Sequence, residues 1–208
     1  MALRITRDGI ELMGAAARAD CRRAVAAEVS RIAVELERVL APRDGRYVPQ
    51  TTVNFDSDGR ICTVVDEGSR TILIHIPLSC MEADPASLYQ RSLNLSHELA
   101  HTLTPCGEPG RATLLDEGLA VFFAEAYTGR PSRPPRRYRE ARDLVRMLLA
   151  TDNGVVRRLR ARHPGKRICD YTAPDILGEV PALDPSVADD LVRRFYCASS
   201  RGTRLTCR

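Results

Sequence analysis

The stretch LNLSHELAHTLTP, residues 93–105, constrains the fold more than any other part of the chain. Together with the residues before it, this stretch predicts a helix over 83–103. Positions four apart on a helix differ by about 40° around its axis, so His97 and His101 stand on one face, one turn apart. Glu98 lies about 100° further round the axis from His97. The chain must therefore fold so that two imidazoles and a neighbouring carboxylate share one environment.

The two histidines point to a metal site. Their ring nitrogens can meet one ion at about 2.0–2.1 Å. Glu98 can lean over that ion without binding it, which is where a general base takes a proton from metal-bound water. The alternative interpretation is a chance match, in which a polar helix simply carries two histidines. Two ligands do not hold a catalytic zinc ion, because three protein ligands are usual and the fourth position is left for water.

A third ligand is available in LLDEGLAVFF, where Glu117 lies in the first turn of the next predicted helix, 113–127. If residues 104–112 join two antiparallel helices, Glu117 comes back against the histidine face. Cys106 is close enough in sequence to be a ligand, but we expect it to be a packing residue.

The segments HELAH and DEGLA resemble those of the gluzincin metallopeptidases, in particular the small single-domain enzymes called minigluzincins. In that family the first segment supplies two zinc ligands and the catalytic glutamate, and the second segment supplies the third ligand. The resemblance implies that His97, His101 and Glu117 bind one Zn²⁺ ion. It also implies that Glu98 is the general base of a zinc metallopeptidase that hydrolyses peptide bonds through a zinc-activated water.

The resemblance covers about residues 51–127 in the order of elements and is specific only at the two quoted segments. The spacing between these segments is slightly shorter than in larger gluzincins, so Glu108 and Glu125 stay as weaker alternatives to Glu117. Within the second segment, the small residues Gly118 and Ala120 fit a close approach of the two ligand-bearing helices.

Two roles stay open at this point. Gluzincins usually stabilise the oxyanion with a Tyr or His from the C-terminal half, and nothing in the sequence chooses between Tyr127, His163 and Tyr171. The carboxylate that orients a zinc-bound histidine is also open, with Asp116 and Glu125 as candidates. Asp116 has a competing role, because with Thr113 it fits a capping box.

The order of the predicted elements indicates an α+β fold. An Ala-rich amphipathic helix is predicted over 15–42. Three short β stretches (51–55, 60–65 and 70–77) are separated by turn residues, which predicts a meander of three strands. Beyond the two ligand-bearing helices, further helices are predicted at 138–150, 154–162 and 186–197. We therefore expect a zincin-like fold: a small antiparallel or mixed sheet, an active-site helix and a helical C-terminal part. The predicted units are a metallopeptidase core with an N-terminal helix over 1–130, and an Arg-rich helical subdomain with a flexible tail over 131–208.

Positive charge is concentrated in residues 130–167, which hold twelve Arg, Lys166 and only three acidic residues, a net charge of +10, whereas the rest of the chain carries −6. One interpretation is an anionic partner, such as nucleic acid, an acidic membrane surface or an acidic substrate. The other, which we favour, is a solvated helical surface. The segment holds one aromatic residue, Tyr138, and therefore no stacking platform for single-stranded nucleic acid.

The chain has seven cysteines, an odd number, and no C-x-x-C motif. The sequence therefore indicates neither a disulfide framework nor a cysteine zinc site. No signal-peptide pattern and no apolar run long enough to span a bilayer is visible. We therefore expect a cytoplasmic protein without a membrane span.

Two other functions compete with a general metallopeptidase. The repressor-cleaving ImmA/IrrE family also carries an H-E-x-x-H helix and a later glutamate, although the Leu-Met-Pro that often follows there is missing here and no helix-turn-helix is evident. A nucleic-acid-associated protein with zinc in a non-peptidase role would instead use the basic segment. The presence of Glu98 argues against the second, because a structural zinc site needs no base there.

Overall fold

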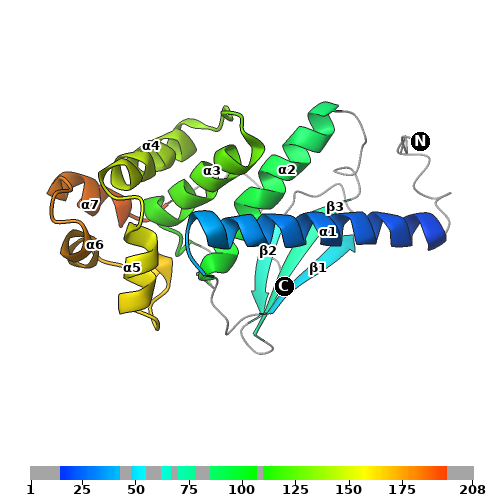
Figure 1. The fold of residues 1–208 in the computed structure, drawn as a ribbon, viewed down its shortest axis with the longest axis horizontal. Helices are drawn as coiled ribbons and strands as arrows, with labels where there is room; N and C mark the ends of the chain where they lie inside the picture. The colour runs from blue at the N-terminus through cyan, green and yellow to red at the C-terminus, as the bar shows by residue number, and fades with distance from the viewer. Residues whose placement is uncertain are drawn as a thin grey trace.

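The computed structural model describes residues 15–42, 48–54, 62–66, 70–77, 85–106 and 110–195 (Figure 1). Seven α-helices lie in these ranges: α1 (Ala15–Val39), α2 (Pro85–Ala100), α3 (Leu114–Thr128), α4 (Arg136–Thr151), α5 (Val155–Arg162), α6 (Ala173–Glu179) and α7 (Pro185–Leu191). Two 3₁₀ turns, η3 (His101–Leu103) and η4 (Ile168–Asp170), connect them. The helices predicted at 15–42, 113–127, 138–150 and 154–162 are thus confirmed within a few residues. Helix α6 was missed, and α7 is shorter than predicted.

Helix α1 buries one stripe of apolar side chains against the other helices. The stripe follows the three- and four-residue spacing of a helix face, with Val25, Val29, Ile32, Leu36 and Leu40 all buried. Val34, another apolar residue of the helix, lies off this spacing and is 70% exposed.

Helices α2, α3 and α4 form the layer that carries the candidate site, and Figure 1 shows α3 beside α4. Leu95 and Leu99 of α2 share one buried cluster with Leu115, Leu119 and Phe123 of α3. Each fully buried Leu or Phe side chain contributes about 1.5–3 kcal/mol relative to an exposed one. This packing fixes the start of α3 relative to the end of α2.

Gly118 sets how closely α3 and α4 approach. A Cβ atom at this position would overlap the carbonyl group of Ala141 and lie 2.6 Å from Val145 Cγ2. The small residue is therefore needed against α4. The predicted partner of this glycine was α2, and the structure corrects that.

The backbone of three short strands, β1 (Val48–Asn54), β2 (Cys62–Asp66) and β3 (Thr71–Pro77), pairs in the order β1-β3-β2. β1 runs parallel to β3, with Val48 opposite Thr71, and β2 runs antiparallel to it, with Cys62 opposite His75. The predicted meander is therefore wrong, because a meander would place β2 between the other two strands.

The predicted α+β, zincin-like fold class is also wrong. Seven helices dominate the described structure, and no side chain in the described buried clusters comes from a strand. The part of the chain whose side chains are described is thus all-α. The local β propensity of three short stretches does not determine how much of the core a sheet supplies.

One buried cluster continues across residue 130, since Phe123 of α3, Val145 of α4 and Leu191 of α7 all belong to it. The division into 1–130 and 131–208 stays a prediction, and its flexible tail falls beyond residue 195, outside the described residues. Among the described helices, none has the combination of length and apolar character that crossing a bilayer requires.

Candidate metal centre

His97, His101 and Glu117 lie together and could hold a metal ion, with one ligand atom from each within 4.8 Å of the others. The two Nε2 atoms are 3.3 Å apart, and Glu117 Oε2 lies 3.4 Å from that of His97 and 3.8 Å from that of His101. Ligand atoms about 2.1 Å from a tetrahedral zinc ion stand roughly 3.4 Å from one another. The three atoms therefore have the separation that one central ion needs.

Two elements supply these side chains. His97 belongs to the last turn of α2, and His101 opens η3, so the helix tightens at the second histidine without moving it off the shared face. Glu117 comes from the first turn of α3. The two histidine side chains are 19% exposed and that of Glu117 is 12% exposed, which leaves the cluster partly open to solvent.

The carboxylate of Glu117 supports the assignment independently of the spacing. Its Oε2 atom is buried and has no hydrogen-bond partner. Leaving a buried carboxylate oxygen unsatisfied is costly, and native proteins rarely do so without a reason. A cation held between this oxygen and the two imidazoles would remove the cost, so the residues present fit a metal ion.

Asp116 orients His101. The Nδ1–H of His101 donates a hydrogen bond of 3.2 Å to Asp116 Oδ1. Because a carboxylate only accepts, Nδ1 carries the proton and Nε2 is the atom turned toward the cluster. Asp116 and not Glu125 is thus the carboxylate behind a candidate ligand.

The predicted capping box forms only in part. The side chain of Thr113 accepts a 3.4 Å hydrogen bond from the backbone N–H of Asp116, which caps α3. The Asp116 carboxylate does not reach back to the cap. It instead holds His101 and accepts a 3.5 Å hydrogen bond from the thiol of Cys106. Cys106 therefore supports Asp116 and lies outside the metal-binding cluster.

The charges of the cluster shift its protonation. Burial alone would lower the pKa of His101, but the charges of Asp116 and Glu117 outweigh it and raise this pKa to about 10. Burial would raise the pKa of Glu117, but His101 and His97 outweigh that and lower it. Without a metal, protonated His101 therefore attracts the carboxylates of Asp116 and Glu117. A metal ion that binds His101 must displace its proton.

Glu98 follows His97 on α2 and is partly exposed. Its charge contributes to the raised pKa of His101, which places the carboxylate within electrostatic reach of the cluster. Glu108, one of the two weaker alternatives for the third ligand, lies outside the described residues.

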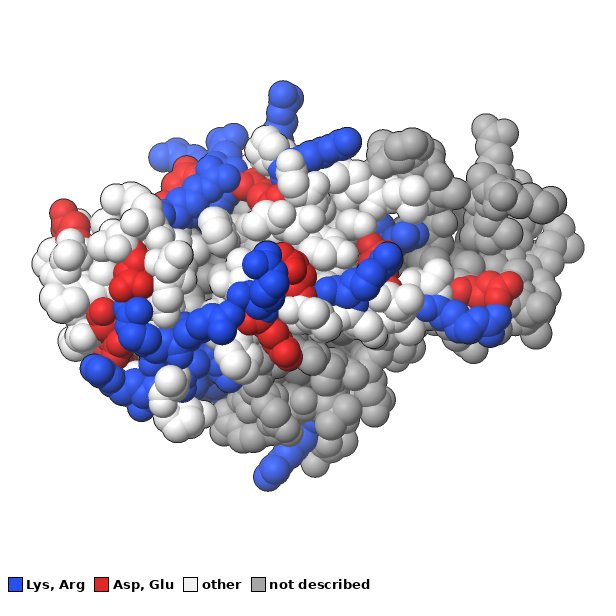
Figure 2. All heavy atoms as spheres, viewed as in Figure 1, with Lys and Arg blue, Asp and Glu red and all other residues white. Residues whose placement is uncertain are grey.

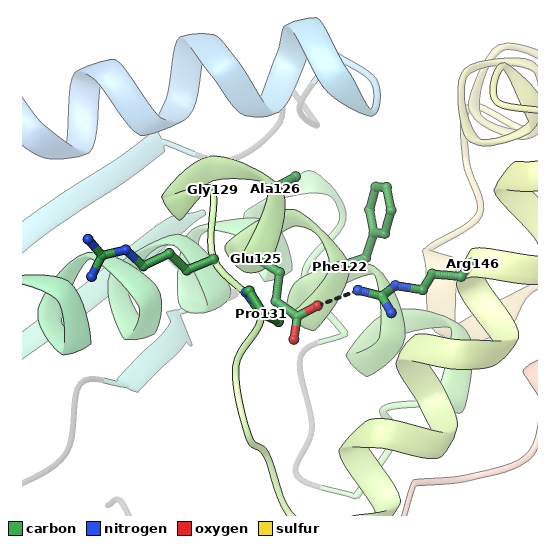
Figure 3. A pocket seen from close by; sticks show the side chains of 7 residues that line it. Phe122, Glu125, Ala126, Gly129, Pro131 and Arg146 are labelled. Atoms are coloured by element: carbon green, nitrogen blue, oxygen red, sulfur yellow. Dashed lines mark hydrogen bonds and ion pairs between the residues drawn. The ribbon is translucent and has the colours of Figure 1, made fainter.

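Glu125, the other alternative, belongs to a different network at the far end of α3. Figure 3 shows its carboxylate directed at Arg146, with which it forms a 2.7 Å ion pair. It also accepts hydrogen bonds from the backbone and side chain of Ser132 and pairs with Arg142 at 3.0 Å. With its oxygens satisfied, Glu125 has no part in the metal centre.

Sequence reasoning missed Tyr138 of α4. Its ring stands edge-on to that of His97, with 6.0 Å between the centroids. The three residues proposed for the oxyanion make their described contacts elsewhere: Tyr127 against Phe123, and His163 against Tyr171. Tyr138 is distinctive in the sequence as the one aromatic residue of the basic segment. Nothing in the neighbouring residues, however, indicates that it lies beside His97.

Five of the thirteen cations of the basic segment form ion pairs with carboxylates of neighbouring elements. Arg142 and Arg146 pair with Glu125, Arg158 and Arg162 with Glu179, and Lys166 with Asp175. Figure 2 shows acidic side chains interleaved with the basic ones on the face in view. This arrangement favours the interpretation as a solvated helical surface.

Comparison of the chain with protein-family models, with curated proteins and with solved structures finds no match. The residues of the site and their geometry are therefore the basis for assigning a function.

Proposed function

We propose that this protein is a zinc-dependent metallopeptidase. One observation carries the proposal: the unsatisfied buried oxygen of Glu117 lies 3.4 Å from His97 Nε2 and 3.8 Å from His101 Nε2. Glu98 follows His97 in sequence and lies within electrostatic reach of His101. Nitrogen and carboxylate donors in a set of three suit zinc and leave a coordination position open. The resemblance of HELAH and DEGLA to the gluzincin segments points the same way.

In this proposal a zinc ion at the cluster would supply Lewis acidity, lowering the pKa of water and polarising a peptide carbonyl. Glu98 accepts the proton of the attacking water and passes it to the leaving amine. His101 is kept in the correct tautomer by Asp116, so its Nε2 stays directed at the cluster.

Tyr138 is the group that we assign to the developing oxyanion. Its ring lies 6.0 Å from that of His97, and the contact with Phe195 at 4.7 Å holds it in place. A phenol that donates a hydrogen bond to a developing oxyanion lowers the barrier selectively in the transition state.

The decisive experiment compares zinc-loaded wild type with Glu98→Gln on a mixed peptide library, with metal content measured in both. We expect cleavage by the wild type, a loss of turnover on the order of 10²–10⁴-fold in the variant, and one zinc ion in each. Equal cleavage by both proteins would reveal a contaminating peptidase. Cleavage by neither, with zinc bound to both, would contradict a general peptidase and leave either a dedicated regulatory protease or a non-peptidase role.

A repressor-cleaving protease of the ImmA/IrrE type would use the same residues and differ only in substrate. The library result separates the two, because a dedicated regulatory protease would leave short peptides intact and cut one folded partner. The nucleic-acid alternative has less support, since five cations of the basic segment are paired with carboxylates.

A further inference from the structure

An arginine-lined cavity of about 380 Å³ lies where the start of α3, the first turns of α4 and the segment after α7 meet. Its lining consists of Leu114, Arg137, Glu140, Arg193, Arg194 and Phe195. The segment after α7 is held against the start of α3 by backbone hydrogen bonds, from Leu114 N to Arg193 O at 3.0 Å and from Phe195 N to Ala112 O at 2.8 Å. The cavity wall is therefore tied to the helix that carries Glu117.

Tyr138 links this cavity to the metal centre. Its ring lies 6.0 Å from that of His97 and 4.7 Å from that of Phe195, which lines the cavity. An extended peptide advances about 3.3–3.6 Å per residue, so the cavity is within roughly three residues of a bond held at the cluster. A substrate that reaches His97 can thus place a side chain or its terminus in the cavity.

The cavity carries an excess of positive charge, since three guanidinium groups and one carboxylate line it. Arg193 pairs with that carboxylate, Glu140, at 2.8 Å and with Asp190 at 3.1 Å. Arg194 instead donates hydrogen bonds to the backbone carbonyl oxygens of Arg111 and Cys169. These neutral acceptors do not cancel the positive charge of its guanidinium group. Arg137 is exposed on the first turn of α4.

We infer that this cavity binds a carboxylate of the peptide substrate, from either an acidic side chain or the C-terminus. The inference rests on the proposed peptidase function. A planar guanidinium matches a carboxylate with two parallel hydrogen bonds, and Leu114 and Phe195 offer apolar walls for the methylene groups that carry it.

Binding is tested on the zinc-loaded full-length Glu98→Gln protein, so that no peptide is consumed. The probes are fluorescent peptides of neutral sequence in which one Glu is moved along the chain, each made with a free and with an amidated C-terminus. We expect one Glu position, or the free terminus, to tighten binding on the order of tenfold at low salt, and less at high salt. The free and amidated series show which carboxylate is bound.

Arg137→Gln and Arg193→Gln, each placed on the Glu98→Gln background, should lose this preference. Arg137→Glu should shift it toward peptides with Lys at the same position. The matched control is Arg139→Gln, which removes the same charge from an exposed position of α4 that does not line the cavity. Thermal unfolding of each variant confirms that it is folded.

Equal binding of all the peptides, wherever the Glu stands and whether the C-terminus is free or amidated, an equal loss in Arg139→Gln, or no peptide binding at all would overturn the inference. Cleavage by the wild type separates this failure from that of the proposed function. Cleavage with no preference for a Glu at any position or for a free C-terminus supports a peptidase and rules out the subsite. Selective carboxylate binding without any cleavage leaves the subsite and removes the peptidase.

Discussion

Glu117 and Glu125 lie about two turns apart on α3, and their side chains are similarly enclosed, at 12% and 6% exposed. Glu125 is neutralised by the protein, through Arg142, Arg146 and two hydrogen bonds from Ser132. Glu117 instead faces two imidazoles and keeps a buried oxygen without a hydrogen bond. Burial therefore does not distinguish a structural carboxylate from a candidate metal ligand, whereas the presence or absence of hydrogen bonds and ion pairs to its oxygens does.

The largest expected effect separates the two glutamates by metal content. Glu117→Gln should lower zinc affinity on the order of 10³-fold, because a binding free energy of about 10–16 kcal/mol is shared among a few ligands. Glu125→Gln should keep full affinity. Both are measured by competition with a chromogenic chelator, and similar affinities in the two variants would break the comparison.

For the free energy of unfolding of the metal-free protein, Glu125→Gln should have the larger effect and Glu117→Gln the smaller one. Glu125→Gln should lower the free energy of unfolding by about 2 kcal/mol, less than for a fully buried pair because Arg146 is half exposed. Urea unfolding of the metal-free protein measures this loss. Ser132→Ala is the matched control, since it removes only one of the hydrogen bonds. A loss no larger than that of Ser132→Ala would mean that the ion pairs contribute nothing.

Asp116→Asn sharpens the picture around Glu117, because it keeps the shape of the side chain that holds His101 and removes its charge. We expect zinc affinity to fall about tenfold, the lower end for groups that orient a metal ligand. Asp175→Asn, which alters a carboxylate paired with Lys166 away from the cluster, is the control. Unchanged affinity in Asp116→Asn would show that His101 needs no charged partner.

The smallest expected effect is a gradual dependence on pH in the metal-free protein. The pKa of His101 is raised from 6.5 to about 10, so its protonated form stabilises the fold fully below pH 6.5, and this contribution is lost as pH rises toward 10. The difference in urea midpoint between wild type and His101→Gln should therefore shrink from pH 6.5 to pH 10. A constant difference would contradict the assignment. Zinc affinity should rise over the same interval, since the proton competes with the metal.

Local pattern alone determined the helices and part of the site. The four-residue spacing of His97 and His101 fixes one shared face, because a helix turns through a set angle per residue. Glu117 was reached through the resemblance and a short connection between helices. These features depend on residues near one another in sequence, where backbone geometry leaves few alternatives.

Tertiary structure decided the rest. Asp116 was recognisable as an acidic residue at a helix start, but only the packing of α3 on η3 made it the partner of His101 rather than a cap. The position of Tyr138 beside His97, the contact of Gly118 with α4, the parallel pairing of β1 with β3 and the arginine-lined cavity all join segments far apart in the chain. Such contacts depend on how whole helices and strands pack, which the local sequence does not specify.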